Sequence, residues 1–142
     1  MGKEFISSFG AIIPGARRRS RARVVREFVA AMNAQDYDRA VGLVTPEFVF
    51  ADTAGGRIDG TERFVTVARV YYPAAGYPTV VLTELLQRKD MVLARGHLTD
   101  GEGAMGSRTL WQISFRGNRI GRIEVTRSES QTTLPSFSTR MQ

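Results

Sequence analysis

The first part of the chain shows the spacing of an amphipathic helix. Between about Ser20 and Ala34, apolar residues recur at intervals of one, three and four positions. They are Val24, Val25, Phe28, Val29 and Met32. A single apolar stripe of this kind is typical of a helix that packs one face on a core. The sequence therefore predicts a first helix over this segment.

Two further helices are predicted on either side of a short strand. Asp36 is placed to cap a short helix, which Thr45 and Pro46 end. A brief apolar strand is expected at residues 48–51, followed by a turn over residues 52–56, where Gly55 and Gly56 lie. The third helix is expected from about Thr61 to Tyr72.

The second half of the chain has the composition of β-strands. Four segments are rich in β-branched and aromatic residues, and polar breaks between them are suited to hairpin turns. The predicted strands are residues 79–87, 91–99, 107–115 and 120–127. Three helices followed by a four-stranded meander predict an α+β domain in which a bent sheet wraps around the helices.

Composition narrows the classes of function. The 142 residues fit one domain, and no apolar run approaches the roughly 20 residues of a transmembrane helix. The chain has no cysteine, which excludes disulfides, thiolate catalysis and cysteine-based metal sites. The only histidine, His97, excludes a multi-histidine metal site within one chain. We therefore expect a cytoplasmic protein that has no metal and no cofactor.

The net charge of +6 is concentrated at the N-terminus. Seven basic residues and one acidic residue lie within residues 1–26, and the remainder of the chain is balanced. We accordingly divide the chain into a basic and apolar arm (1–19), a folded domain (20–127) and a loosely held polar tail (128–142). The apolar residues of the arm favour a short docking helix that ends at Pro14 and Gly15. The arginines after it suit either a solvated helix start or contact with nucleic acid or an acidic surface, although the domain itself has no basic stripe.

The segment VVREFVAAMNAQDYDRAVGLVTPEFVFADTAGGRIDGTERF, residues 24–64, resembles the nuclear-transport-factor-2-like superfamily. This superfamily includes ketosteroid isomerase and the SnoaL-type polyketide cyclases, and the resemblance spans about residues 20–127. It implies a cystatin-like α+β barrel, in which a cone-shaped, curved and mainly antiparallel sheet wraps around three N-terminal helices and encloses one pocket. It also implies a homodimer that pairs through its sheets. Because the superfamily hosts many reactions, the resemblance does not select one.

The candidate catalytic base is an aspartate in the turn after the first strand. Residues 50–55, FADTAG, resemble the loop that carries the base of ketosteroid isomerase, and this resemblance places Asp52 on that position. A carboxylate at the mouth of an apolar pocket is partly desolvated, which raises its pKa and suits a proton acceptor. The oxyanion-hole tyrosine and aspartate of that isomerase fall on Phe28 and Trp111, so we do not expect steroid isomerisation. The alternative is that Asp52 only binds its own turn.

Two further candidates lie on the second predicted strand. Alternation places Leu93, Arg95, His97 and Thr99 on one face, which we expect to line the pocket. Arg95 would orient the carboxylate or steady negative charge, and His97 would share the proton. The alternative for Arg95 is an ion pair with a carboxylate, and the alternative for His97 is a histidine buried in the core. The predicted pocket residues are Phe28, Met32, Tyr71, Tyr72, Thr109, Trp111, Ile113, Ile123 and Val125.

These residues predict a small cofactor-independent enzyme that acts on a hydrophobic, oxygenated molecule such as a polyketide, terpenoid or steroid-like compound. Isomerisation, cyclisation, dehydration and epoxide opening all use a pocket carboxylate for acid–base chemistry. The alternative is a non-catalytic ligand-binding or dimerisation module of the same fold. A third hypothesis is that the basic arm tethers the domain to nucleic acid or an acidic surface.

Overall fold

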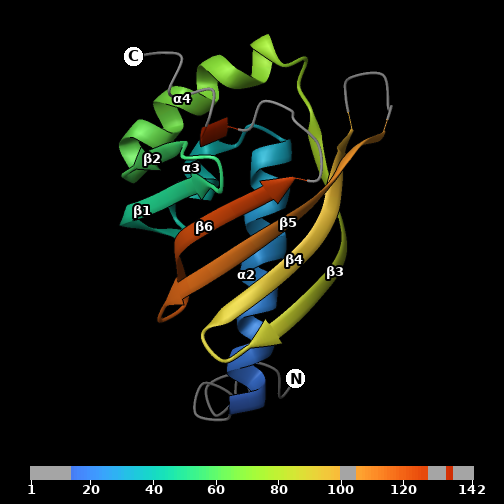
Figure 1. Cartoon of the computed structure of the whole chain (residues 1–142). Coiled ribbons are helices and arrows are strands. Elements are labelled where there is room, and N and C mark those ends of the chain that lie inside the picture. Colours follow the sequence, from blue (N-terminus) through green and yellow to red (C-terminus); the bar gives the residue numbers. More distant parts are fainter. Residues whose placement is uncertain (1–13, 100–104, 128–133, 136–142) are drawn as a thin grey trace, which may run out of the picture.

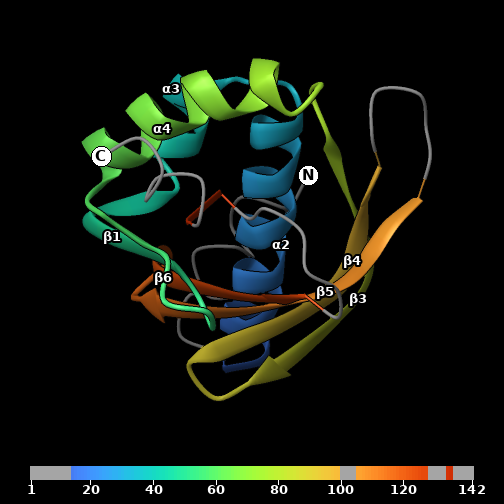
Figure 2. The same ribbon diagram turned by 45° about the horizontal axis from the view of Figure 1, so that its top comes forward.

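The computed structural model describes the backbone of residues 14–99, 105–127 and 134–135, and the side chains of residues 21–99, 108–127 and 134–135. Its elements are α2 (Pro14–Asn33), α3 (Tyr37–Val41), β1 (Val44–Asp52), β2 (Arg57–Asp59), α4 (Thr61–Ala74), β3 (Thr79–Arg88), β4 (Met91–Thr99), β5 (Met105–Arg116) and β6 (Arg119–Arg127). The sheet curls around one side of α2, and α4 lies across the end of that helix (Figures 1 and 2). None of the described helices is long and apolar enough to cross a membrane. The predicted α+β fold is confirmed.

One six-stranded sheet has the order β2-β1-β6-β5-β4-β3. The predicted meander forms β3 to β6, and all of its neighbours are antiparallel. β1 pairs with β6 in parallel and extends the curled sheet. β1 is longer than predicted and takes in Thr45 and Pro46, which were expected to end a helix. The register between β1 and β6 shifts between Val44 and Val49, where Pro46 has no N–H to donate.

The helix predicted to start near Ser20 is α2, which begins earlier, at Pro14. Proline suits the first helical turn because the N–H groups there have no partner within the helix, so proline loses no hydrogen bond. The helix therefore runs without a break across the expected boundary between arm and domain. The expected docking helix of the arm lies outside the described residues.

The end of α2 and the start of α3 form one tight connection. Gln35 has a φ of 54°, and the N–H of Asp36 donates to the carbonyl of Ala31 at 2.8 Å, which closes the helix end. The carboxylate of Asp36 then accepts from the N–H of Arg39 at 3.2 Å and caps α3, as predicted.

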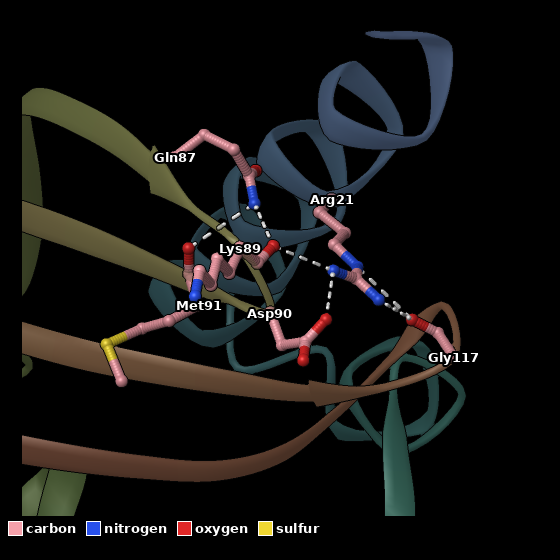
Figure 3. Close-up of polar contacts among 6 residues, drawn as sticks. All are labelled: Arg21, Gln87, Lys89, Asp90, Met91 and Gly117. Carbon is pink, nitrogen blue, oxygen red and sulfur yellow. Dashed lines mark hydrogen bonds and ion pairs between the residues drawn. The ribbon is translucent and has the colours of Figure 1, made fainter. Parts of the chain in front are cut away.

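Two side chains of α2, one near its middle and one at its C-terminal end, fasten the helix to the sheet. Asn33 exchanges two hydrogen bonds with the backbone of Val80, one at 3.0 Å and one at 2.8 Å. Near the middle of the helix, Arg21 donates to the carbonyls of Gly117 and Lys89 and to the carboxylate of Asp90 (Figure 3). Its guanidinium thus joins the β3–β4 turn to the β5–β6 turn. Arg21 is 8% exposed, so the alternative of a solvated helix start does not hold for this arginine.

A cluster of aromatic rings forms the core between α2, α4 and β1. The rings of Phe48 and Phe64 meet edge to face with centroids 5.2 Å apart, and Phe28 lies 6.1 Å from each of them. All three residues are buried. Edge-to-face packing is the favoured arrangement of such rings. The cluster fixes the position of α2 over the sheet.

Part of the predicted loose tail is also core. Leu134 is 5% exposed, and Pro135 is fully buried. Leu134 packs with the main hydrophobic cluster. The expectation of a loosely held tail is therefore wrong for these two residues, because their apolar side chains complete the burial of the core.

Candidate functional site

Two adjoining cavities lie on the inner face of the sheet. The first has a volume of about 70 Å³ and is lined by Val25, Phe28, Val29, Met32, Phe50, Phe64, Tyr72, Val80, Leu82, Ala94, Trp111, Ile113 and Ile123. The second has a volume of about 50 Å³ and is lined by Phe50, Tyr71, Tyr72, Pro78, Val80, Leu98, Trp111, Val125, Arg127 and Leu134. Both volumes are well below the roughly 300–1,000 Å³ of pockets for drug-sized molecules, so each space holds a small group and a larger molecule would need side chains to move.

All the predicted pocket residues except Thr109 line one of these cavities. Thr109 is buried on the same sheet face but belongs to neither lining. Among the residues that line the first cavity, only Tyr72 and Trp111 carry a group that donates a hydrogen bond. This cavity is therefore suited to the apolar part of a ligand.

Tyr72 separates the two cavities and is almost fully buried. Burial raises the pKa of its hydroxyl, and Tyr71 and Tyr37 add to this effect, whereas the charge of Arg127 acts in the opposite direction. The rings of Tyr71 and Tyr72 meet edge to face with centroids 5.3 Å apart. Tyr72 is thus a neutral hydroxyl at physiological pH, close to a cation.

Asp52 is the last residue of β1 and is 8% exposed. Its Oδ1 accepts from the N–H groups of Ala54 at 2.9 Å and Gly56 at 2.7 Å. These contacts are those of an aspartate that binds its own turn. Asp52 lies directly opposite Val125, a residue of the second cavity, yet it is not itself part of either lining.

Arg95 and His97 do not meet Asp52. Ala94 lies opposite Trp111 and lines the first cavity, so alternation turns Arg95 and His97 to the outer face of the sheet. Arg95 is exposed, and its Nη1 lies 3.5 Å from Oε1 of Glu84. The expected orientation of this strand is therefore wrong. Periodicity separates the two faces of a strand, but only packing decides which face is covered.

Sequence reasoning missed Arg127, which lines the second cavity. The sequence does contain the necessary pattern. Arg127 lies two positions after Val125 and four after Ile123, so strand alternation places it on their face. Within the described parts of the chain, no group of three or more acidic or histidine side chains is arranged to hold a metal ion. The ionisable groups that line the second cavity are therefore Arg127, Tyr71 and Tyr72.

Comparison with known proteins agrees with this architecture. A family model described as a SnoaL-like domain matches residues 25–124. No curated protein matches the chain. A cystatin-fold protein from Novosphingobium aromaticivorans is 24% identical, with a TM-score of 0.65 over 74% of this chain and 96% of that one.

Two further solved structures resemble the fold. A candidate polyketide cyclase from Sinorhizobium meliloti is 20% identical, with a TM-score of 0.65 over 73% of this chain and 94% of that one. A candidate ketosteroid isomerase from Kribbella flavida is 16% identical, with a TM-score of 0.66 over 80% of this chain and 81% of that one. At sequence identities of 16–24%, the similarity of these structures to this chain is evidence for a shared fold.

Proposed function

The chain belongs to the SnoaL-like domain family, and on that premise we propose that it binds a small hydrophobic, oxygenated molecule and converts it by acid–base chemistry without a cofactor. The observation that carries this proposal is the apolar cavity between α2 and the inner face of the sheet. Cavities of this kind, with few polar groups, are the usual form of a small-molecule site.

Isomerisation and cyclisation are the reaction classes that we favour. The fold is shared with a candidate ketosteroid isomerase and a candidate polyketide cyclase, and both names describe reactions of a carbon skeleton next to a carbonyl group. Such reactions begin with removal of a proton from carbon, which needs a base beside an apolar space. Dehydration and epoxide opening also need a base, which takes a proton from carbon in the first reaction and from the attacking water in the second, and they are the next candidates.

Asp52 is the residue that we assign as the base. Three features support this role: it is buried, it shares a sheet face with Phe50, and it lies opposite Val125. Phe50 lines both cavities and Val125 lines the second, and this neighbourhood supports a place for Asp52 at their edge. Ala54 and Gly56 hold Oδ1 through their backbone N–H groups, which fixes the position of the carboxylate.

The experiment measures exchange of deuterium from heavy water into the carbon beside the carbonyl of small cyclic ketones, together with their binding. In Asp52→Asn the side-chain oxygen still accepts from the turn, but the proton acceptor is lost. Exchange should fall at least about a hundredfold with binding unchanged. The matched control is Asp59→Asn, an exposed aspartate of β2 whose Oδ1 lies 2.8 Å from Nε of Arg57, and it should retain exchange. Full exchange in Asp52→Asn would remove Asp52 from the mechanism.

A second candidate is a non-catalytic ligand-binding module. It is favoured by the contacts of Asp52 Oδ1 with its own turn and by the outward direction of Arg95. The same experiment separates the two proposals, because a binding module retains ketone affinity and shows no exchange above the buffer rate. The sheet-paired homodimer, the cytoplasmic location and the tethering role of the arm remain predictions.

A further inference from the structure

The second cavity differs from the first because it contains a positive charge. Arg127 contributes to its lining, and the Nε atom of this arginine is buried. The hydroxyl-bearing rings of Tyr71 and Tyr72 form another part of the wall. A guanidinium and two tyrosines around a space of about 50 Å³ form a polar compartment with room for a group of a few heavy atoms.

The polar compartment adjoins the apolar one. Phe50, Tyr72, Val80 and Trp111 line both cavities, so these four side chains form the partition between them. A molecule with an apolar body and a polar end therefore matches the two cavities better than a uniformly apolar one does.

Arg127 also lies at the end of the sheet where Asp52 lies. Asp52 is opposite Val125 in the parallel ladder, and Arg127 follows Val125 by two positions on the same face. Arg127 in turn lies opposite Thr109, whose side chain is buried on that face. A ligand group held by Arg127 is thus placed close to the proposed base.

We propose that Arg127 binds a carboxylate at one end of the ligand, so that the substrate class is a small apolar carboxylic acid. This inference rests on the proposed function of the cavity. Guanidinium binds a carboxylate through two parallel N–H donors, a paired geometry that a hydroxyl cannot match, and such charge-assisted bonds are about twice as strong as bonds between neutral groups. Tyr72 supplies a neutral hydroxyl that can donate to the same group.

The test compares two probes of nearly equal shape, cyclohexanecarboxylate and cyclohexylmethanol, by titration calorimetry on the full chain at pH 7. The wild-type protein should bind the carboxylate about ten- to a hundredfold more tightly than the alcohol. Arg127→Gln should remove this preference and leave the affinity for the alcohol unchanged. Arg127→Lys should retain part of it, because an ammonium is a point charge without the planar fork.

The matched control is Arg122→Gln. Arg122 lies on the same strand but faces outward, where its Nη2 is 3.5 Å from Oε2 of Glu124, and its loss should leave the preference intact. Thermal melting of each variant checks that it folds. If Arg127→Gln does not fold, the wild-type protein and Arg127→Lys supply the test. The proposal then requires a preference for the carboxylate in the wild type and a smaller preference in Arg127→Lys.

Each outcome has one meaning. Equal affinity of the wild type for both probes, or a preference that persists in Arg127→Gln, overturns the role of Arg127 and leaves the cavity as a ligand site. Absence of binding for both probes overturns this inference together with the proposed function. A carboxylate preference in a protein without deuterium exchange supports this inference and contradicts the proposed catalysis.

Discussion

Arg21 donates two hydrogen bonds to the carbonyl oxygen of Gly117, at 3.2 Å and 3.4 Å, across 96 positions of sequence. A third bond reaches the carbonyl of Lys89 at 3.1 Å, and the guanidinium lies 5.4 Å from the ring centroid of Phe115. One side chain of α2 therefore holds two hairpin turns (Figure 3). With Asn33 bound to Val80 at the C-terminal end, α2 is held at two points, residues 21 and 33, over the cavities.

Replacing Arg21 with methionine should lower the free energy of unfolding by about 2–4 kcal/mol, because two carbonyl groups lose a charged donor. Urea denaturation measures this change. Arg23→Met is the control, since Arg23 has a side chain that is 79% exposed and pairs with Glu27 one turn away. Its effect should stay within about 0.5 kcal/mol. Equal losses in the two variants would contradict the role assigned to Arg21.

Gly96→Ala should destabilise the protein by roughly 3 kcal/mol, because a Cβ at this position would lie 2.0 Å from the carbonyl oxygen of Val81. The close approach lies next to the register shift between Leu82 and Glu84, where the sheet bends. Gly121→Ala is the matched control: its new Cβ would meet the Cγ of Arg116 at 3.4 Å, and it should cost under about 1 kcal/mol. Thermal melting of both variants checks the difference, and similar melting temperatures would argue against a sterically required glycine.

Stability should fall with pH above about 10 because burial raises the pKa of Tyr72 in the folded state. In that range the unfolded tyrosine releases its proton and the folded one retains it, so the free energy of unfolding drops by about 1.4 kcal/mol per pH unit. Tyr72→Phe should reduce this slope by that amount in urea titrations between pH 10 and 11.5. Phe48→Leu, which removes packing without a titrating group, should lower stability and keep the wild-type slope. An unchanged slope in Tyr72→Phe would show that Tyr72 ionises without unfolding.

Ala94→Leu should block ligand binding by filling the first cavity, which Ala94 lines from β4. Affinity for a small ketone should fall at least about tenfold, while stability changes by under about 1.5 kcal/mol because the new side chain occupies existing space. Gln112→Leu adds an apolar side chain on the outer face and should leave binding intact. Calorimetry of the three proteins tests this, and unchanged affinity in Ala94→Leu would place the ligand elsewhere.

The outer face of the sheet is expected to form the homodimer. Leu86 lies opposite Leu93 on this face, and Val81 is 38% exposed. Light scattering at micromolar concentration should give twice the chain mass of 15.7 kDa. Leu93→Lys should shift the protein to the monomer and preserve ketone binding. A monomeric wild type would exclude this dimer.

Local patterns in the sequence determined most of the fold. Helical spacing around Phe28, the cap at Asp36 and the β-rich segments after Thr79 each depend on neighbours within a few residues, so a single sequence reveals them. The same is true of the pocket residues on the strands, because alternation places Trp111, Ile123 and Val125 on inward faces once the fold is known.

Only the tertiary structure decided which side of each element is covered. Periodicity allows either Arg95 or Ala94 to face inward, and the position of α2 over the face that carries Ala94 and Trp111 selects Ala94. The buried state of Arg21 depends on two turns far along the chain, which no local pattern reports. The charge of the second cavity likewise comes from Arg127, whose position beside Tyr72 exists only because the curled sheet brings β6 toward α4. Contacts between distant segments determine these features, since they depend on the relative placement of elements rather than on the conformation of each.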